Sequence, residues 1–186
     1  MNEQTKKIAE RIRELSGQKE RVTVAIDGRC AAGKTTLASK LQDMLGGSVI
    51  HADSFFLRPE QRTPERYATP GENIDHERLL SEVLIPLSSG SPVEYSPFNC
   101  KTRTLDKPIR LPMSKITVIE GSYCCHPSLI DFYDLKIFLD IDSQAQKERI
   151  LLRNKENSEM FFKKWIPLEE LYIKSLADKK IFDIII

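Results

Sequence analysis

Five short apolar runs divide the chain, and segments with helical periodicity lie between them. The runs cover residues 22–26, 48–53, 116–121, 135–141 and 182–186. Because they are nearly continuous in apolar residues rather than alternating, they are typical of strands in a parallel sheet covered on both faces. The pattern therefore predicts an α/β fold with three layers, in which a five-stranded, mainly parallel sheet lies between helices.

The predicted helices carry recognisable start and stop signals. Apolar residues between positions 8 and 15 share one face of an N-terminal helix, which Gly17 would end. Asp75 is placed to cap a helix with four apolar residues between positions 79 and 84. Further along, Ser143 and Gln146 have capping-box spacing, and Pro167 is placed to open a last helix.

Two segments interrupt this alternation of strands and helices. Residues 57–74 combine prolines with charges, which predicts a surface excursion. At about residues 88–114, four prolines separate short β-like pieces, and this predicts a small hairpin-like insertion. No internal repeat or low-complexity tract divides the rest, so we expect a single domain over residues 1–186.

Composition and charge narrow the classes of protein. The 186 residues include 28 basic and 27 acidic side chains, so bulk charge predicts no binding to nucleic acid or a membrane surface. No apolar run is long enough to cross a bilayer, and the N-terminus lacks a signal-peptide core. The four cysteines show no C-x-x-C spacing. We therefore expect a cytoplasmic protein with reduced thiols.

Residues 28–35 read GRCAAGKT and match the phosphate-loop motif G-x-x-x-x-G-K-[ST] in full. The motif follows the first apolar run and precedes the helical segment 36–45, as such a loop requires. Its glycines let N–H groups face phosphate oxygens, while Lys34 reaches the β- and γ-phosphates and Thr35 ligates Mg²⁺. The residues predicted to bind the nucleotide are Gly28, Arg29, Cys30, Ala31, Ala32, Gly33, Lys34, Thr35 and Thr36.

Three carboxylates stand at the ends of apolar runs and are candidates for the remaining chemistry. Asp53 ends the second run, where it could accept a hydroxyl proton, hold a metal-bound water or cap the following turn. Glu120 ends the third run and would hold Mg²⁺ directly or through water, or form a structural ion pair. Asp140 also ends an apolar run, but together with Asp142 it immediately precedes a helix, where we expect capping rather than metal binding.

Arg149 and Arg153 are four residues apart on a predicted helix and therefore share one face. In a kinase, such a pair could neutralise charge that builds on a transferred phosphoryl group. The surrounding residues are also charged, so a solvated helix face is the alternative explanation.

Four blocks of the sequence together resemble the uridine kinase-like branch of the P-loop kinases. They are the phosphate loop and residues 51–56 (HADSFF), 118–121 (VIEG) and 182–185 (FDII). That branch also includes phosphoribulokinase, nicotinamide riboside kinase and bacterial pantothenate kinase. The resemblance covers about residues 20–186. It implies the P-loop NTPase fold, with a helical lid at about residues 149–165 that supplies the two arginines as catalytic groups.

The resemblance also implies an activity and the residues that carry it. It implies a kinase that uses ATP and Mg²⁺ to phosphorylate a hydroxyl of a small nucleoside-like metabolite. Asp53 would be the general base, and Glu120 would organise the magnesium with Thr35. Asp75 would hold ribose hydroxyls, and Tyr95 would line the acceptor pocket. Because uridine kinases are often oligomers, the resemblance leaves a homo-oligomer open.

The chain departs from uridine kinases in the stretch after Tyr95. Residues 98–102 read FNCKT, where uridine kinases carry a histidine that reads the pyrimidine. Two alternatives therefore stay open: a kinase for a non-nucleoside acceptor such as pantothenate, and a catalytically degenerate protein that binds a nucleotide and a metabolite. A regulatory GTPase is not favoured, because the chain lacks a complete N-K-x-D motif, and an ABC-type ATPase would need its signature downstream of the loop.

Overall fold

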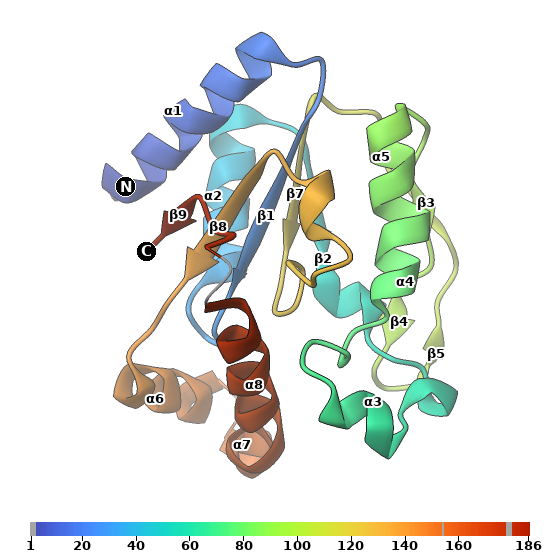
Figure 1. Ribbon diagram of the computed structural model, residues 1–186, viewed down its shortest axis with the longest axis vertical. Helices are drawn as coiled ribbons and strands as arrows, with labels where there is room; N and C mark the ends of the chain where they lie inside the picture. The colour runs from blue at the N-terminus through green and yellow to red at the C-terminus, as the bar shows by residue number, and fades with distance from the viewer. Residues whose placement is uncertain (1–2, 154, 178–179) are drawn as a thin grey trace.

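A computed structural model describes residues 3–153, 155–177 and 180–186. Its central sheet contains five strands in the order β2-β7-β1-β8-β9 (Figure 1). Their bounds are Val22–Gly28 (β1), Ser48–His51 (β2), Ile116–Glu120 (β7), Leu135–Leu139 (β8) and Ile184–Ile185 (β9). Every pairing within this sheet is parallel. The predicted five-stranded sheet is thereby confirmed, and it is parallel throughout.

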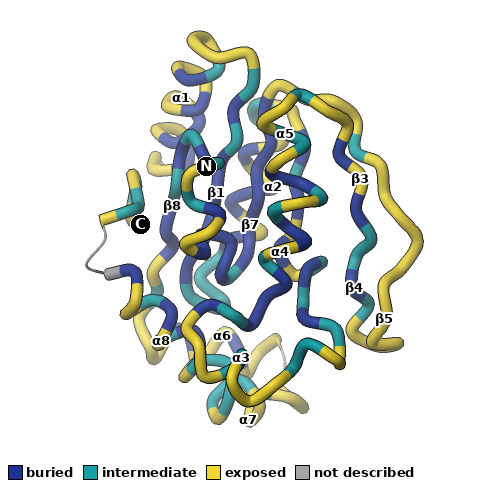
Figure 2. Tube along the Cα trace, turned by 45° about the vertical axis from the view of Figure 1, so that its right-hand side comes forward, coloured by how far each residue is buried: buried dark blue, intermediate teal, exposed yellow. Residues whose placement is uncertain are grey.

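Helices cover both faces of the sheet and make the three predicted layers. On one face, α1 (Glu3–Gln18) and α2 (Lys34–Leu45) pack against the side of β1 that carries Val24 and Ile26. The opposite face, which carries Ala25, packs against the helical segment from residue 76 to residue 89 and against α8 (Ile166–Ala177). Figure 2 shows β1, β7 and β8 as mostly buried and the outer turns of the helices as exposed. No helix among residues 3–153, 155–177 and 180–186 has the length and apolar character needed to span a bilayer.

Two helical segments contain a wide π-helical turn shortly before a proline. The first joins α4 (His76–Arg78) to α5 (Ile85–Ser89) through the turn Leu79–Leu84, which precedes Pro86. The second joins α7 (Ser158–Met160) to α8 through the turn Phe161–Trp165, which precedes Pro167. Proline lacks an N–H and crowds the carbonyl four residues earlier, and in both segments that carbonyl lies within the wide turn. Pro167 is the second residue of α8, so the prediction that it opens the last helix is confirmed, and the wide turn Phe161–Trp165 continues the helical path before it.

The helix cap predicted on Asp75 is confirmed, whereas the one predicted on Ser143 is wrong. Asp75 accepts a hydrogen bond from the backbone N–H of Arg78. At the start of α6 (Ser143–Arg153), Asp142 Oδ1 instead accepts the backbone N–H groups of residues 144 and 145. An aspartate in the cap position satisfies the first free amides of a helix as well as a serine does.

The insertion is a long hairpin, as predicted. It contains two short antiparallel pairs, formed by β3 (Glu94–Tyr95), β6 (Ile109–Arg110), β4 (Phe98–Asn99) and β5 (Thr104–Leu105). Residues 57–74, predicted as a surface excursion, include α3 (Pro64–Ala68), with Thr63 as its cap and Pro64 in its first turn. The remaining short helical turns are of the 3₁₀ type and span Ala52–Phe55, Pro59–Gln61, Ile130–Phe132 and Lys155–Asn157.

Candidate active site

A cavity of about 870 Å³ opens where β1, β2 and β7 end. The phosphate loop and the first turn of α2 form its floor, while residues of the long hairpin, of the 57–74 segment and of the lid form its walls. Carboxyl ends of parallel strands are where open α/β sheets bind ligands. The cavity therefore lies where the sequence predicted the site.

The phosphate loop has the backbone that its glycines allow. Gly28 has φ +136°, and a Cβ atom there would lie 2.1 Å from the carbonyl oxygen of Leu139. Gly33, with φ 107°, precedes α2, whose first turn receives no side-chain cap. The first residues of that helix line the cavity, and uncapped N–H groups at a helix start are the groups that bind phosphate.

Lys34 and Thr35 are held by short hydrogen bonds. The Lys34 ammonium is almost buried and donates to the carbonyl oxygens of Gly28 (2.6 Å) and Arg29 (3.0 Å) and to Ser122 Oγ (3.1 Å). Thr35 Oγ1 donates to Glu120 Oε1 over 3.0 Å. A hydroxyl beside a carboxylate offers the hard oxygen atoms that Mg²⁺ prefers, so these residues fit the predicted metal.

Six of the nine residues predicted to bind nucleotide line the cavity, and three do not. The lining residues are Cys30, Ala31, Gly33, Lys34, Thr35 and Thr36. Gly28 and Ala32 lie outside the lining, where Gly28 lets the loop pass close to β8. Arg29 points away: its backbone N–H donates to Leu139, and its guanidinium forms ion pairs with Glu170 and Asp140. Asp140 therefore has a structural role, as a partner of Arg29.

Two carboxylates from neighbouring strands face the cavity. Glu120, at the end of β7, is 5% exposed and accepts hydrogen bonds from Thr35 and from His51 Nδ1 (2.6 Å). This hydrogen bond raises the pKa of His51. Asp53 follows β2 and exposes its side chain to the cavity. Burial within the cavity and the nearby charge of Glu120 raise the pKa of Asp53. A raised pKa makes Asp53 a better proton acceptor than an ordinary aspartate.

Sequence reasoning missed Glu169, which contacts the loop from α8. Its carboxylate accepts the backbone N–H of Cys30 with both oxygens (2.8 and 2.9 Å) and the Ser122 hydroxyl (2.8 Å). The side chain is 4% exposed, and burial raises the pKa of Glu169. The available signal was a pair of acids after Pro167, since Glu170 also binds the loop, through Arg29.

Asp27, directly before the loop, was also missed. It is 1% exposed and accepts hydrogen bonds from the backbone N–H groups of Gly28, Tyr123 and Cys125 and from the Tyr172 hydroxyl. Burial raises the pKa of Asp27, whereas these hydrogen bonds oppose the rise. Asp27 thereby ties the end of β1 to the segment after β7 and to α8, and a lone acid after an apolar run was the signal for it.

Of the three residues predicted to bind the acceptor, Asp53 lines the cavity, whereas Asp75 and Tyr95 lie outside its lining. Asp75 is 1% exposed and caps the helix that follows it, while Tyr95 packs on Phe55 with ring centroids 5.1 Å apart. The lining on that side consists instead of side chains that sequence reasoning did not select, among them Arg62, Asn73 and Arg103. A hairpin wall cannot be assigned residue by residue from a sequence pattern, which explains the miss.

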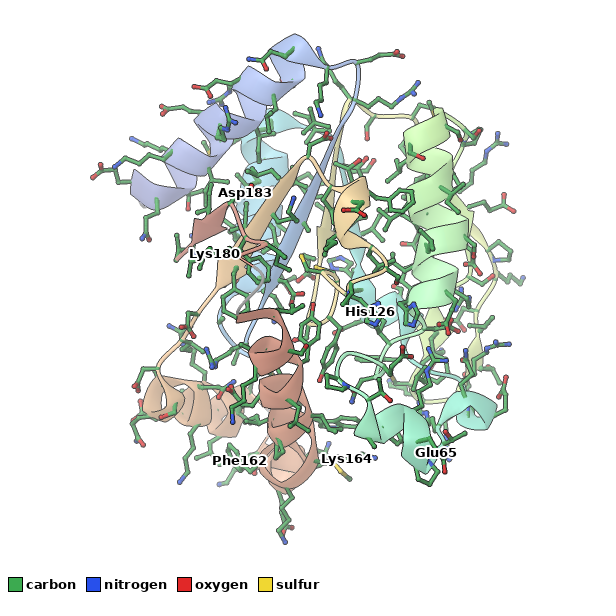
Figure 3. The ribbon with its side chains drawn as sticks, viewed as in Figure 1. Glu65, His126, Phe162, Lys164, Lys180 and Asp183 are labelled. Carbon is green, nitrogen blue, oxygen red and sulfur yellow. The ribbon has the colours of Figure 1, made fainter. Side chains whose placement is uncertain are left out.

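The lid forms the remaining wall, and it brings the predicted arginines with it. Arg149 and Arg153 both line the cavity, and Arg149 donates to the carbonyl oxygen of Ala31 over 3.1 Å. Trp165 lines the cavity as well. Lys164 extends from the lid toward α3, as Figure 3 shows, and its ammonium lies 4.2 Å from the centre of the Tyr67 ring. The lid therefore contacts the opposite wall of the cavity.

A family model for the phosphoribulokinase/uridine kinase family matches residues 23–158. Among curated proteins, the chain is 26% identical over 151 residues to a uridine kinase from Limosilactobacillus reuteri, which covers 75% of this chain and 68% of that protein. It is 27% identical over 146 residues to mouse uridine-cytidine kinase-like 1, covering 73% of this chain and 27% of that protein. The chain thus matches only about a quarter of the mouse protein.

Among solved structures, the chain is similar to one from Bacillus stearothermophilus described as a possible uridine kinase. The TM-score is 0.67 and the sequence identity is 21%, with 96% of this chain and 98% of that chain covered. At this identity the likeness shows that the two proteins share a fold.

Proposed function

The chain belongs to the phosphoribulokinase/uridine kinase family, and from that premise we propose that it is an ATP- and Mg²⁺-dependent kinase. Its product would be the phosphate ester of a small metabolite that carries a hydroxyl group. That the metabolite is nucleoside-like rests on the resemblance alone. The proposal of Mg²⁺ is supported by the Thr35–Glu120 pair, and that of ATP by the uncapped start of α2 beside Lys34.

One observation carries the proposal: Asp53 lines the same cavity as the phosphate loop. A phosphate loop alone binds a nucleotide, but transfer to an alcohol needs a group that accepts the hydroxyl proton. Asp53 stands beside Glu120 and Lys34 closely enough for their charges to act on its pKa. This acid–loop arrangement favours a kinase over a protein that only binds nucleotides.

The residues divide the reaction among them. Lys34 and the amides of the loop would hold the phosphates, and Asp53 would orient the acceptor hydroxyl and take its proton as the oxygen attacks the γ-phosphorus. Arg149 and Arg153 would neutralise charge on the transferring group. When bound, Mg²⁺ would neutralise charge on the phosphate oxygens, held by Thr35 and Glu120. The lid would exclude water, which otherwise competes with the acceptor.

The experiment is ATP consumption measured against a panel of nucleosides, riboside vitamins and pantothenate. We expect turnover that depends on an acceptor in the wild type and its loss in Asp53→Asn. Asp43→Asn, on an exposed turn of α2, is the matched control and should retain activity. Turnover undiminished in Asp53→Asn would contradict the assigned role of Asp53. Calorimetry separates the alternative, because a degenerate protein would bind ATP and a metabolite without transferring phosphate.

A further inference from the structure

Four arginines line the cavity without a carboxylate partner. Among the residues that the structure describes, Arg62, Arg103, Arg149 and Arg153 form no ion pair. Arginines elsewhere are mostly paired: those at positions 11, 21, 29, 58, 66 and 78 each contact an acid within 4 Å. Unpaired guanidinium groups gathered in one concave site favour anionic ligands there.

The four arginines fall into two sets. Arg149 contacts the loop at Ala31, and Arg153 is one helical turn further along α6. We therefore assign this pair to binding of the nucleotide phosphates. The other set comes from the opposite wall. Arg62 donates to the carbonyl oxygen of Leu57 (2.9 Å) and lies 5.5 Å from the centre of the Phe98 ring. A triphosphate held by Lys34 and the lid therefore leaves the second set without a counter-charge.

Arg103 occupies the turn of the long hairpin, and hydrogen bonds hold that turn. Asn99 fixes it, because its carbonyl oxygen accepts the N–H of Arg103 (2.7 Å) and its side chain bonds Lys101 N–H and Asp106. Cys100 lies in the same turn and lines the cavity together with Asp53. Burial and the charge of Asp53 raise the pKa of the Cys100 thiol, whereas the charge of Arg62 lowers it. Cys100 and Arg103 of the hairpin turn line the same cavity as Arg62 and Asp53.

Asn73 supplies an independent observation on the same wall. Its side chain is 6% exposed and lines the cavity, yet neither the amide nitrogen nor the amide oxygen has a hydrogen-bond partner among the described residues. A buried amide without partners costs free energy, so such a group points to a ligand that completes it. An amide can both donate to and accept from a hydroxyl or carbonyl group.

We propose that the phosphoryl acceptor carries an anionic group, either a carboxylate or a phosphate, which Arg62 and Arg103 bind, while Asn73 binds a neighbouring hydroxyl or carbonyl group. This inference rests on the proposed kinase function and separates the acceptor from neutral nucleosides. The transfer step is unchanged: the acceptor oxygen forms a bond to the γ-phosphorus, the bond to ADP breaks, and Asp53 takes the hydroxyl proton.

Binding of an anionic acceptor can be followed by fluorescence, because Trp165 is the only tryptophan in the chain and it lines the cavity. The protein is saturated with Mg²⁺ and a non-hydrolysable ATP analogue, and tryptophan fluorescence is titrated with matched acceptors. The pairs are pantothenate with panthenol for a carboxylate and ribose 5-phosphate with ribose for a phosphate, with uridine as the neutral nucleoside. We expect the anionic member of at least one pair to bind about tenfold more tightly or better.

Variants assign that preference to the arginines. Arg62→Gln and Arg103→Gln, alone and together, should remove the difference between the paired acceptors, whereas Arg110→Gln, exposed on β6, should keep it. The inference is overturned if the neutral members bind equally well, if no anionic member changes the fluorescence, or if the double variant keeps the preference. Binding of the ATP analogue is measured separately, and its failure in the wild type would contradict the proposed function instead.

Discussion

The hydroxyl of Tyr172 offers a sharp test of how the end of β1 is stabilised. It donates to Asp27 Oδ2 over 2.7 Å, and both side chains are 1% exposed. The other three donors to Asp27 are backbone N–H groups, which cannot act as acceptors. A protonated Asp27 could therefore donate its proton only to the Tyr172 hydroxyl. Because all four neighbouring groups can donate to Asp27, the arrangement favours an ionised carboxylate.

Tyr172→Phe removes this hydrogen bond and little else. Hydrogen bonds to a charged group contribute about 1.5–3 kcal/mol, against about 0.5–1.5 kcal/mol for a neutral pair. The matched control is Tyr133→Phe, because that hydroxyl is also buried and donates over 2.8 Å to a neutral acceptor, the carbonyl oxygen of Cys124. We expect Tyr172→Phe to cost about 1 kcal/mol more than Tyr133→Phe at neutral pH.

Urea unfolding of both variants and the wild type measures the two costs, with equal m-values as the check on two-state behaviour. Burial raises the pKa of Asp27 above its unfolded value, so protonation favours the folded state as the pH falls through the raised pKa. The excess cost of Tyr172→Phe should shrink over that window. Equal costs at neutral pH, or an excess that ignores pH, would refute the ionised carboxylate.

Three further predictions concern the loop and its neighbours. Gly28→Ala places a Cβ 2.1 Å from the Leu139 carbonyl oxygen at φ +136°, and should lower the free energy of unfolding by about 3 kcal/mol or more. Gly17→Ala meets no atom within 4 Å and should lower it by nothing. Thermal melts of the two variants compare these effects. Glu169→Ala leaves the Cys30 N–H without an acceptor and should lower the free energy of unfolding in urea by about 1–3 kcal/mol. The control Glu159→Ala, at an exposed position, should lower it by under about 0.5 kcal/mol. Equal losses would argue against the loop contact. The hydrogen bond to Glu120 raises the pKa of His51, so this bond stabilises the fold fully below the ordinary pKa of 6.5 and loses its effect as the pH rises through the raised pKa. His51→Asn should therefore lower the free energy of unfolding more at about pH 6 than at about pH 9. A difference that stays constant with pH would contradict this.

The sheet and the phosphate loop were predictable because they depend on local chemistry. An apolar run, a glycine at each end of the loop and a following helix place Lys34 and Thr35 without knowledge of the rest of the chain. Glu120 and Asp53 were also predictable as cavity residues, because each lies at or just beyond the carboxyl end of a strand of the parallel sheet. These predictions needed only the rule that such strand ends share one edge.

The acceptor wall could not be predicted because it is built from contacts between distant segments. Tyr95 and Asp75 occur where the family pattern places acceptor residues, but packing on Phe55 and the helix cap turn them out of the cavity lining. Arg103 reaches the cavity only because the hairpin folds back. In the same way, no local pattern pairs Glu169 with Cys30.

The bond from Glu169 to Cys30 joins residues 139 positions apart in the chain. During synthesis, the loop therefore leaves the ribosome well before the carboxylate that fastens it. Until Glu169 has emerged, a growing chain carries a complete phosphate-loop sequence without the support that shapes it. Nucleotide would stabilise the loop only once that support is in place.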